Sequence, residues 1–329
     1  MRGEPAREGP VQRLLASAVG ALVRFVGALP EPIAYGIADL LALPWAAYWA
    51  LKDRRGRRSK GYWRNCRIAF REGGLGPRPK GHLLAFSRHL TWLLVDFCRM
   101  RRITKRNIER HCDLSEFPRL AELHAKGKGI VFATAHVGPW DIAGWAAGLL
   151  GLPITSVYRP SPLPAVDRAI ARARVGTGQD LAAKRGAVFA LKKALAEGRT
   201  VGMLCDVGAK GSDLFAPFLG TNASTIGTPA LLHLWTGAPI AVVTVERTAR
   251  MRFRLRVWDV IEREPGADRR ADVLAIATRI NDGISRAIAE RPAQWFWHGR
   301  RFRHRPPGEV PLPDGLPPLA EPRAARPCE

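Results

Sequence analysis

Short apolar runs alternate with helical segments from Gly129 onward, and this alternation is the feature that most constrains the fold. Strands are expected at residues 130–135, 154–158, 200–205 and 240–245, with an edge strand at 252–257. Helices are expected between them at 140–150, 165–174, 187–196 and 229–236. Such a pattern is typical of an α/β domain, with a central, mostly parallel sheet flanked by helices.

A histidine, a glycine–proline turn and an aspartate follow the first expected strand. His136 stands at the carboxyl end of that strand, where open α/β sheets usually carry their chemistry. Gly138 predicts a turn, and Pro139 suits the first position of the next helix, which puts Asp141 in its first turn. We therefore interpret His136 as a general base whose tautomer is fixed by the Asp141 carboxylate. The alternative is that Asp141 only complements the helix dipole and His136 is an ordinary polar residue.

Several blocks of the chain resemble one known enzyme group. The segment from His136 to Asp141 resembles the His-x4-Asp/Glu motif of the lysophospholipid acyltransferase superfamily. Within it, the chain is most similar to the lipid A biosynthesis (lauroyl/myristoyl) acyltransferases. The further matching blocks, in order, are Val157-Tyr-Arg-Pro160, Asp167 with Arg172 and Arg174, Gly202-Met-Leu-Cys-Asp206, Phe215-Ala-Pro-Phe-Leu-Gly220 and Gln294-Trp-Phe-Trp-His-Gly-Arg-Arg-Phe-Arg-His-Arg-Pro306.

The resemblance implies an acyltransferase that moves a fatty acyl chain from an acyl carrier protein or acyl-coenzyme A to a hydroxyl of an anionic membrane lipid, similar to a lipid A precursor. It implies that His136 and Asp141 are catalytic. Arg174 is expected to bind substrate, because its fork geometry suits phosphate on a carrier arm or on the acceptor. Asp206 follows a strand and is expected to reach the same crevice, and Arg159 is a second candidate for headgroup contact. The alternatives are a surface arginine for Arg174 and a helix or turn cap for Asp206.

The chain departs from the lipid A branch at a few positions. That branch more often has Glu in place of Asp141, and often a second Asp or His in place of Val207 and Gly208. Leu219 stands where the branch has Phe. The segment Gly138-Pro-Trp-Asp141 is similar to that of the phosphatidylinositol-mannoside acyltransferases. Another glycolipid or phospholipid is therefore the alternative acceptor. The Glu-Gly-Thr-Arg block of the glycerol-phosphate acyltransferases is absent, which argues against that group.

The sequence indicates direct acyl transfer without cofactor or metal. No Ser or Cys stands in a nucleophile-elbow motif, so no acyl-enzyme is expected. No set of His, Cys and carboxylate residues has metal-ligand spacing, and the five cysteines contain no Cys-x-x-Cys pair. Such cysteine usage indicates a reducing compartment. A hydrolase that uses the same His–Asp pair on water is an alternative.

The net charge is +23 over 329 residues. Such a surface attracts lipid headgroups, an acidic carrier protein or nucleic acid. No recognised nucleic-acid motif is present, so we expect a membrane surface and a carrier as partners of a monomer and no nucleic acid. A non-catalytic basic binder of membrane or nucleic acid is the competing class. His298 and His304 lie among arginines and are expected to be structural or anion-binding rather than catalytic.

Two apolar segments precede a basic cluster at residues 52–60. Residues 14–29 have the stripe of an amphipathic helix, formed by Leu15, Val19, Leu22, Val26 and Leu29. Residues 33–51 form a helix of about 28 Å, close to the thickness of the bilayer core. Asp39 in it would cost roughly 2.5–3.5 kcal/mol near the bilayer centre, and Pro44 can kink it. A marginal anchor or an interfacial hairpin is predicted, with core helices of a soluble domain as the alternative.

The basic cluster orients the chain by the positive-inside rule, which predicts the cytoplasmic face of a bacterial inner membrane. We therefore expect a membrane segment at 1–60, a helical region at 61–120 and the α/β acyltransferase domain at 121–306. The segment 307–329 is expected to be a disordered tail, because eight prolines fall in the 24 residues from Pro306.

Overall fold

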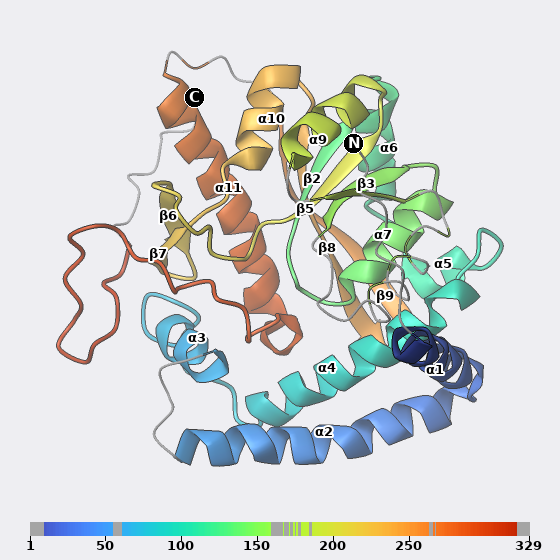
Figure 1. The fold of residues 1–329 in the computed structure, drawn as a ribbon. Coiled ribbons are helices and arrows are strands. Elements are labelled where there is room, and N and C mark those ends of the chain that lie inside the picture. The colour runs from blue at the N-terminus through green and yellow to red at the C-terminus, as the bar shows by residue number, and fades with distance from the viewer. Residues whose placement is uncertain are drawn as a thin grey trace.

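A mostly parallel sheet runs through the centre of the molecule (Figure 1). The computed structural model describes residues 10–54, 61–158, 167, 171, 174, 176, 179–183, 186–262, 266 and 268–320. Within these residues the sheet has seven strands, ordered β1-β9-β8-β2-β5-β3-β4. The strands are β1 (Cys112–Asp113), β2 (Ile130–Thr134), β3 (Ile154–Tyr158), β4 (Asp180–Ala183), β5 (Thr200–Leu204), β8 (Ile240–Ala249) and β9 (Arg252–Ile261).

Five neighbouring strands, β8, β2, β5, β3 and β4, are parallel to one another. β9 runs antiparallel to β8, and β1 is parallel to β9 at the edge. The α/β class with a mostly parallel sheet is therefore confirmed. The sequence pattern did not predict β4 or the separate hairpin of β6 (Phe215–Phe218) and β7 (Thr221–Ser224).

Helices cover both faces of the sheet. α6 (Phe117–Ala125) and α7 (Trp140–Leu149) pack against one face, which presents Phe132 and Ile154. The other face is covered by α9 (Ala187–Ala196), α10 (Thr228–Thr236) and α11 (Arg269–Glu290). β2 and the first half of β8 are buried at nearly every position, and their sequences are accordingly apolar runs rather than alternating patterns. Of the helix expected at 165–174, residues 167, 171 and 174 are helical, and the others lie outside the described residues.

Three long helices form a platform beside the sheet: α1 (Pro10–Ala28), α2 (Glu31–Arg54) and α4 (His82–Arg99). Both α1 and α2 pack against α4. No single helix among the described residues is long and apolar enough to cross a bilayer, although Leu14–Ala28 and Glu31–Leu51, bent by 119° at their junction, meet that test as a pair. Shorter helices are α3 (Tyr62–Ala69), η1 (Met100–Arg102), α5 (Ile108–His111) and η2 (Pro292–Gln294).

The carboxylates of the platform have partners. Asp39 on α2 accepts hydrogen bonds from Arg88 Nε at 2.6 Å and Trp92 Nε1 at 2.7 Å, both on α4. Asp96 on α4 is buried and accepts a hydrogen bond from Arg247 Nε on β8 at 2.8 Å. The hydrogen bonds to Asp39 stabilise an acidic residue inside an apolar helix. The Asp96–Arg247 hydrogen bond connects the platform to the sheet.

Residues 307–320 differ from the disordered tail that their proline content predicts. The carbonyl of Pro317 accepts a hydrogen bond from Arg71 Nη1 at 2.7 Å, and that of Pro318 accepts one from Thr221 Oγ1 at 2.6 Å. Proline lacks an N–H group but keeps a carbonyl acceptor, so an extended proline-rich segment can still be held against a folded surface. Residues 321–329 lie outside the described part of the chain.

Candidate active site

The loop that carries His136 leaves the carboxyl end of β2 and makes a tight turn before α7. Gly138 has a φ of +61°, and a Cβ there would lie 1.9 Å from the carbonyl oxygen of Val245 on β8. Only glycine fits this close approach. Pro139 immediately precedes α7 rather than forming its first residue, and Asp141 lies in the first turn as expected. The turn leaves the His136 side chain 23% exposed.

Asp206 contacts His136 twice. It lies just beyond β5, and the parallel register of Thr134 with Leu204 brings the two carboxyl ends side by side. Oδ1 of Asp206 lies 2.9 Å from His136 Nδ1, and Oδ2 accepts the backbone N–H of His136 at 3.1 Å. The carboxylate is buried, with 3% of the residue exposed. An ionised carboxylate only accepts hydrogen bonds, so Nδ1 carries the proton and Nε2 has the lone pair.

The segment that follows η2 closes over the His136 loop. Trp295 forms a bridge with Val137 and donates its indole N–H to Asp206 Oδ2 at 2.8 Å. The backbone N–H of Phe296 donates to the carbonyl of His136 at 2.9 Å. We call residues 294–297 the strap. The sequence singled out this block only by resemblance, and its aromatic composition is the signal that marks it as buried.

Asp141 is paired with Arg174 instead of with His136. Arg174 Nε donates to Asp141 Oδ1 at 2.7 Å, and both side chains are about one fifth exposed (21% and 20%). The Arg174 guanidinium also lies 5.9 Å from the centre of the Tyr158 ring. The orienting contact expected from Asp141 is therefore supplied by Asp206. The reason is that sheet register brings Asp206 level with His136, whereas Asp141 is carried into the first turn of α7.

The surrounding charges adjust the pKa of both members of the His136–Asp206 pair. Burial acts to lower the pKa of His136, but the charge and hydrogen bond of Asp206, with the charge of Asp141, raise it above its ordinary value. Burial acts to raise the pKa of Asp206, but His136 and the Trp295 hydrogen bond lower it below its ordinary value. Asp206 thus stays ionised while His136 titrates, an arrangement suited to taking a proton from a hydroxyl.

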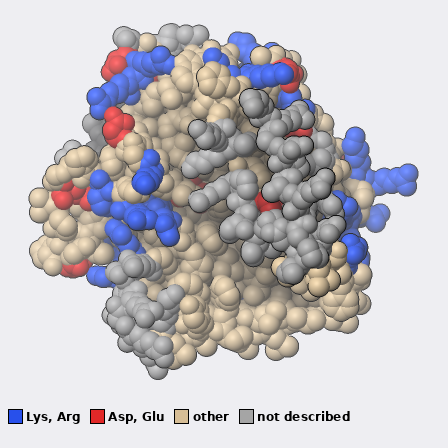
Figure 2. Space-filling view, viewed as in Figure 1, with Lys and Arg blue, Asp and Glu red and all other residues tan. Residues whose placement is uncertain are grey.

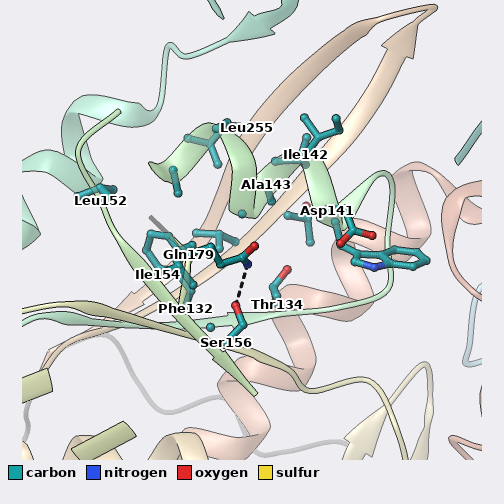
Figure 3. A pocket seen from close by; sticks show the side chains of 18 of the residues that line it. Phe132, Thr134, Asp141, Ile142, Ala143, Leu152, Ile154, Ser156, Gln179 and Leu255 are labelled. Carbon is teal, nitrogen blue, oxygen red and sulfur yellow. Dashed lines mark hydrogen bonds between the residues drawn. The ribbon is translucent and has the colours of Figure 1, made fainter. Parts of the chain in front are cut away.

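An apolar pocket lies between α7 and the sheet (Figure 3). Its wall includes Phe132 from β2, Ile154 from β3, Ile142 from α7 and Leu120 from α6. Trp140, which also lines the pocket, has its ring centre 5.0 Å from that of His136. A pocket with such a wall suits a hydrocarbon chain.

Comparison with known proteins places this chain in a family. The family model for bacterial lipid A biosynthesis acyltransferases matches residues 10–304. The chain belongs to this family. Its match therefore spans the platform, the sheet and the strap, and it confirms the branch that the ordered sequence blocks indicate.

Individual members of the lipid A acyltransferase family are distant relatives. The chain is 28% identical over 212 residues to the lipid A biosynthesis palmitoleoyltransferase of Escherichia coli (strain K12), and equally to the lipid A biosynthesis acyltransferase of Shigella flexneri. A lipid A biosynthesis acyltransferase of Haemophilus influenzae is 22% identical over 209 residues. The matches cover 62–63% of this chain and 64–66% of the relatives' own length.

The other site residues suggested by the sequence are not part of the His136–Asp206 pair. Arg159 and Arg172 lie outside the described residues. His298 packs against Trp49, with ring centres 4.2 Å apart. It also packs against Phe296 of the strap, whose ring in turn lies 5.9 Å from that of His136. Among the residues described, no group of three or more His, Cys, Asp and Glu side chains could hold a metal ion.

Proposed function

We propose that this lipid A acyltransferase family member transfers a fatty acyl chain from a thioester to a hydroxyl of a membrane lipid, with His136 as the general base. The observation that carries the proposal is the His136–Asp206 pair, next to an apolar pocket that is lined in part by Trp140, a ring neighbour of His136. The pair supplies a proton acceptor, and the pocket supplies a place for the chain.

The proposed step needs one proton transfer in each direction. His136 Nε2 takes the proton of the acceptor hydroxyl as its oxygen attacks the thioester carbonyl. The carbon–oxygen bond forms, the carbon–sulfur bond breaks, and the imidazolium returns the proton to the departing thiolate. Asp206 holds the tautomer and stabilises the imidazolium. Asp141 adds a negative charge nearby, which explains why an acidic residue is useful there without direct contact.

Arg174 is the proposed contact for a phosphate group. Its present partner, Asp141, accepts through one oxygen, so the planar guanidinium retains donors for a phosphate on a carrier arm or on the acceptor. We propose acyl carrier protein or acyl-coenzyme A as donor and a lipid A precursor-like acceptor. A phosphatidylinositol-mannoside-like glycolipid or another phospholipid is the alternative acceptor.

We further propose that the platform rests on the cytoplasmic face of the inner membrane. Figure 2 shows the lower part of the molecule, where α2 lies in Figure 1, largely free of charged side chains. Large apolar side chains on α1 and α2 that are more than 40% exposed are Leu14, Leu15, Leu22, Phe25, Ile33, Ile37, Leu40, Leu41, Leu43, Trp45, Tyr48 and Leu51. An apolar area of this extent is typical of a membrane or protein interaction surface.

The test combines lipid analysis with complementation. Cells lacking the protein should lose one acylated lipid by mass spectrometry, and the wild-type gene should restore it whereas His136→Ala should not. His304→Ala is the matched control, because His304 is another partly buried histidine for which we propose no catalytic role. Restoration by His136→Ala would overturn the base assignment. An unchanged lipid profile in the deleted cells, together with no transfer by purified protein, would favour the non-catalytic binder.

A further inference from the structure

The strand β8 extends beyond the point where it pairs with its neighbour β2. The two strands pair at residues 131–133 of β2 and 240–242 of β8, whereas β8 continues to Ala249. Past this pairing, the loop between β2 and α7 lies beside β8, and Gly138 passes so close to the carbonyl of Val245 that only glycine fits. Main-chain groups along such an edge need hydrogen-bonding partners when they are buried.

Gln294, the first residue of the strap, joins this part of β8 to the loop. Its side-chain Oε1 accepts the backbone N–H of Arg247 at 2.9 Å, and its Nε2 donates to the backbone carbonyl of the same residue at 2.8 Å. Its own carbonyl accepts the backbone N–H of Gly138 at 2.9 Å. The glutamine amide therefore pairs with β8 as the main chain of another strand would, while the glutamine main chain holds the loop.

The chemistry of these two contacts requires an amide side chain. The main chain of Arg247 offers one donor and one acceptor, and a primary amide offers one of each in return. A carboxylate only accepts, so it would face the Arg247 carbonyl with a second acceptor. An apolar side chain of the same length would leave both groups unpaired, which is unfavourable in a half-buried position.

Arg247 is itself fixed to the platform. The residue is buried, and its side chain donates from Nε to Asp96 Oδ2 at 2.8 Å and from Nη1 to His89 Nδ1 at 2.8 Å. Burial and the charge of Arg247 lower the pKa of His89, so the imidazole is neutral and accepts this hydrogen bond. Asp96 also accepts the hydroxyl of Tyr35 on α2. The position of β8 at Arg247 is therefore set by contacts with α2 and α4.

We propose that Gln294 is a positioning residue for His136, which it serves by fixing the loop and the strap to the platform-anchored part of β8. The proposal rests on the proposed function of His136 as the base. Its effect passes through two short connections. Gln294 holds Gly138, two residues after His136, and the next residue, Trp295, donates to Asp206. A shift of either connection would change the contact between Asp206 and the imidazole, and a misplacement of about 1 Å can cost about 10²-fold in rate.

The first arm of the test measures the protonation of His136 and does not depend on turnover. The histidine signals of the purified full-length protein in detergent micelles are followed with pH by NMR, and the His136 signal is identified by its absence in His136→Ala. Burial lowers the pKa of His136, and of the charges that face the ring, Asp206 and Asp141 raise it and Arg174 lowers it.

Gln294→Met removes both side-chain hydrogen bonds at similar length. The contact between Asp206 and the imidazole should loosen, so the pKa of His136 should fall. Gln294→Asn keeps the amide but is one methylene too short to reach both groups of Arg247, and it should act in the same direction. It provides the measurement if the Met variant does not fold.

The second arm measures transfer from tetradecanoyl-coenzyme A to a lipid A precursor in mixed micelles. Gln294→Met should lower kcat by between about tenfold and about 10²-fold with KM nearly unchanged, because the positioned base acts in the transition state. The acid limb of the pH–rate profile should move to lower pH, in parallel with the NMR titration.

Asn65→Leu is the matched control. Asn65 Nδ2 donates to the carbonyls of Trp297 at 2.7 Å and Gly299 at 2.8 Å, so this amide holds the same segment of the chain from α3 instead of from β8. The control should lower the melting temperature without moving the His136 titration.

An unchanged His136 titration in both Gln294 variants, or an equal change in Asn65→Leu, would overturn the inference, because the segment would then act through packing alone. Transfer by the wild type in that case leaves the proposed function standing. If the wild type transfers no acyl group while the titration still depends on Gln294, the result counts against the proposed function and supports the positioning of the imidazole.

Discussion

Trp295 donates its indole N–H to Oδ2 of Asp206 at 2.8 Å. The same oxygen accepts the backbone N–H of His136, while the other oxygen faces the imidazole. The carboxylate is therefore held from two sides and cannot rotate without losing a hydrogen bond. This relationship makes the strap part of the proposed catalytic geometry, although it lies far along the chain from both β2 and β5.

Asp206→Asn should change the pH dependence of catalysis as well as its rate. The proposed base must be neutral to accept a proton, so kcat/KM should rise with pH through the His136 pKa, which Asp206 and Asp141 raise above its ordinary value. Removing the Asp206 charge should lower that pKa and move the acid limb to lower pH. The maximal rate should fall, by as much as about 10⁴-fold, because the imidazole loses its fixed tautomer. A pH–rate profile measures both effects.

Asp141→Asn distinguishes the two carboxylates. The Asp141 charge also raises the pKa of His136, but Asp141 is hydrogen-bonded to Arg174 and not to the imidazole. Asp141→Asn should therefore move the acid limb of the pH–rate profile to lower pH, by less than Asp206→Asn does. The maximal rate should be less affected than in Asp206→Asn. The maximal rates of the two variants are compared at a pH above the acid limb of each, by pre-steady-state or steady-state kinetics. A larger loss from Asp141→Asn would return the orienting role to Asp141.

Trp295→Phe should lower kcat while leaving KM nearly unchanged. The substitution keeps an aromatic side chain, with a smaller ring, but removes the donor to Asp206, and a hydrogen bond to a charged group contributes about 1.5–3 kcal/mol. We expect a loss of about tenfold or more. Trp297→Phe is the control, because Trp297 donates to the carbonyl of Pro292 at 2.7 Å and does not contact Asp206. Equal losses in the two variants would mean that the strap acts only through packing.

Gly138→Ala should disrupt the His136 loop. The added Cβ would overlap the carbonyl of Val245, and the positive φ adds a strain of about 1–2 kcal/mol. Both the melting temperature and kcat should fall. Gly211→Ala separates the two costs, because Gly211 also has a positive φ, of +74°, but has open space around its Cβ position. A Gly138 variant as stable and active as the Gly211 variant would contradict the close approach.

Leu40→Ser combined with Leu41→Ser should weaken binding to vesicles. These side chains are 68% and 57% exposed on α2, and burial of each leucine contributes about 1.5–3 kcal/mol. The loss should persist at high salt, because salt does not screen the apolar contribution. Co-sedimentation with anionic vesicles measures it. Val310→Ser combined with Leu312→Ser removes exposed apolar side chains outside the platform and should leave binding unchanged. Equal binding by all three proteins would argue against the platform as the membrane surface.

Local pattern was sufficient to predict much of this fold. The short apolar or β-branched runs at β2, β3, β5 and β8 are recognisable because strands inside a covered parallel sheet are rich in such residues. The Gly138 turn and the helix after it are also local properties, so the position of His136 at a strand end followed from neighbouring residues alone. β4 is short and mixed in polarity, and the β6–β7 hairpin depends on contacts distant in sequence, so neither has a clear local signal.

The partners of His136 were decided by tertiary structure. Sequence proximity favoured Asp141, five residues away, but α7 carries that carboxylate to Arg174. Asp206 reaches His136 because β2 and β5 are parallel neighbours in register, a relationship that no segment of the chain encodes by itself. Trp295 reaches the same carboxylate because the chain folds back after α11. Local residues therefore determined which group we propose as the base, and the arrangement of strands determined which groups hold that imidazole in place.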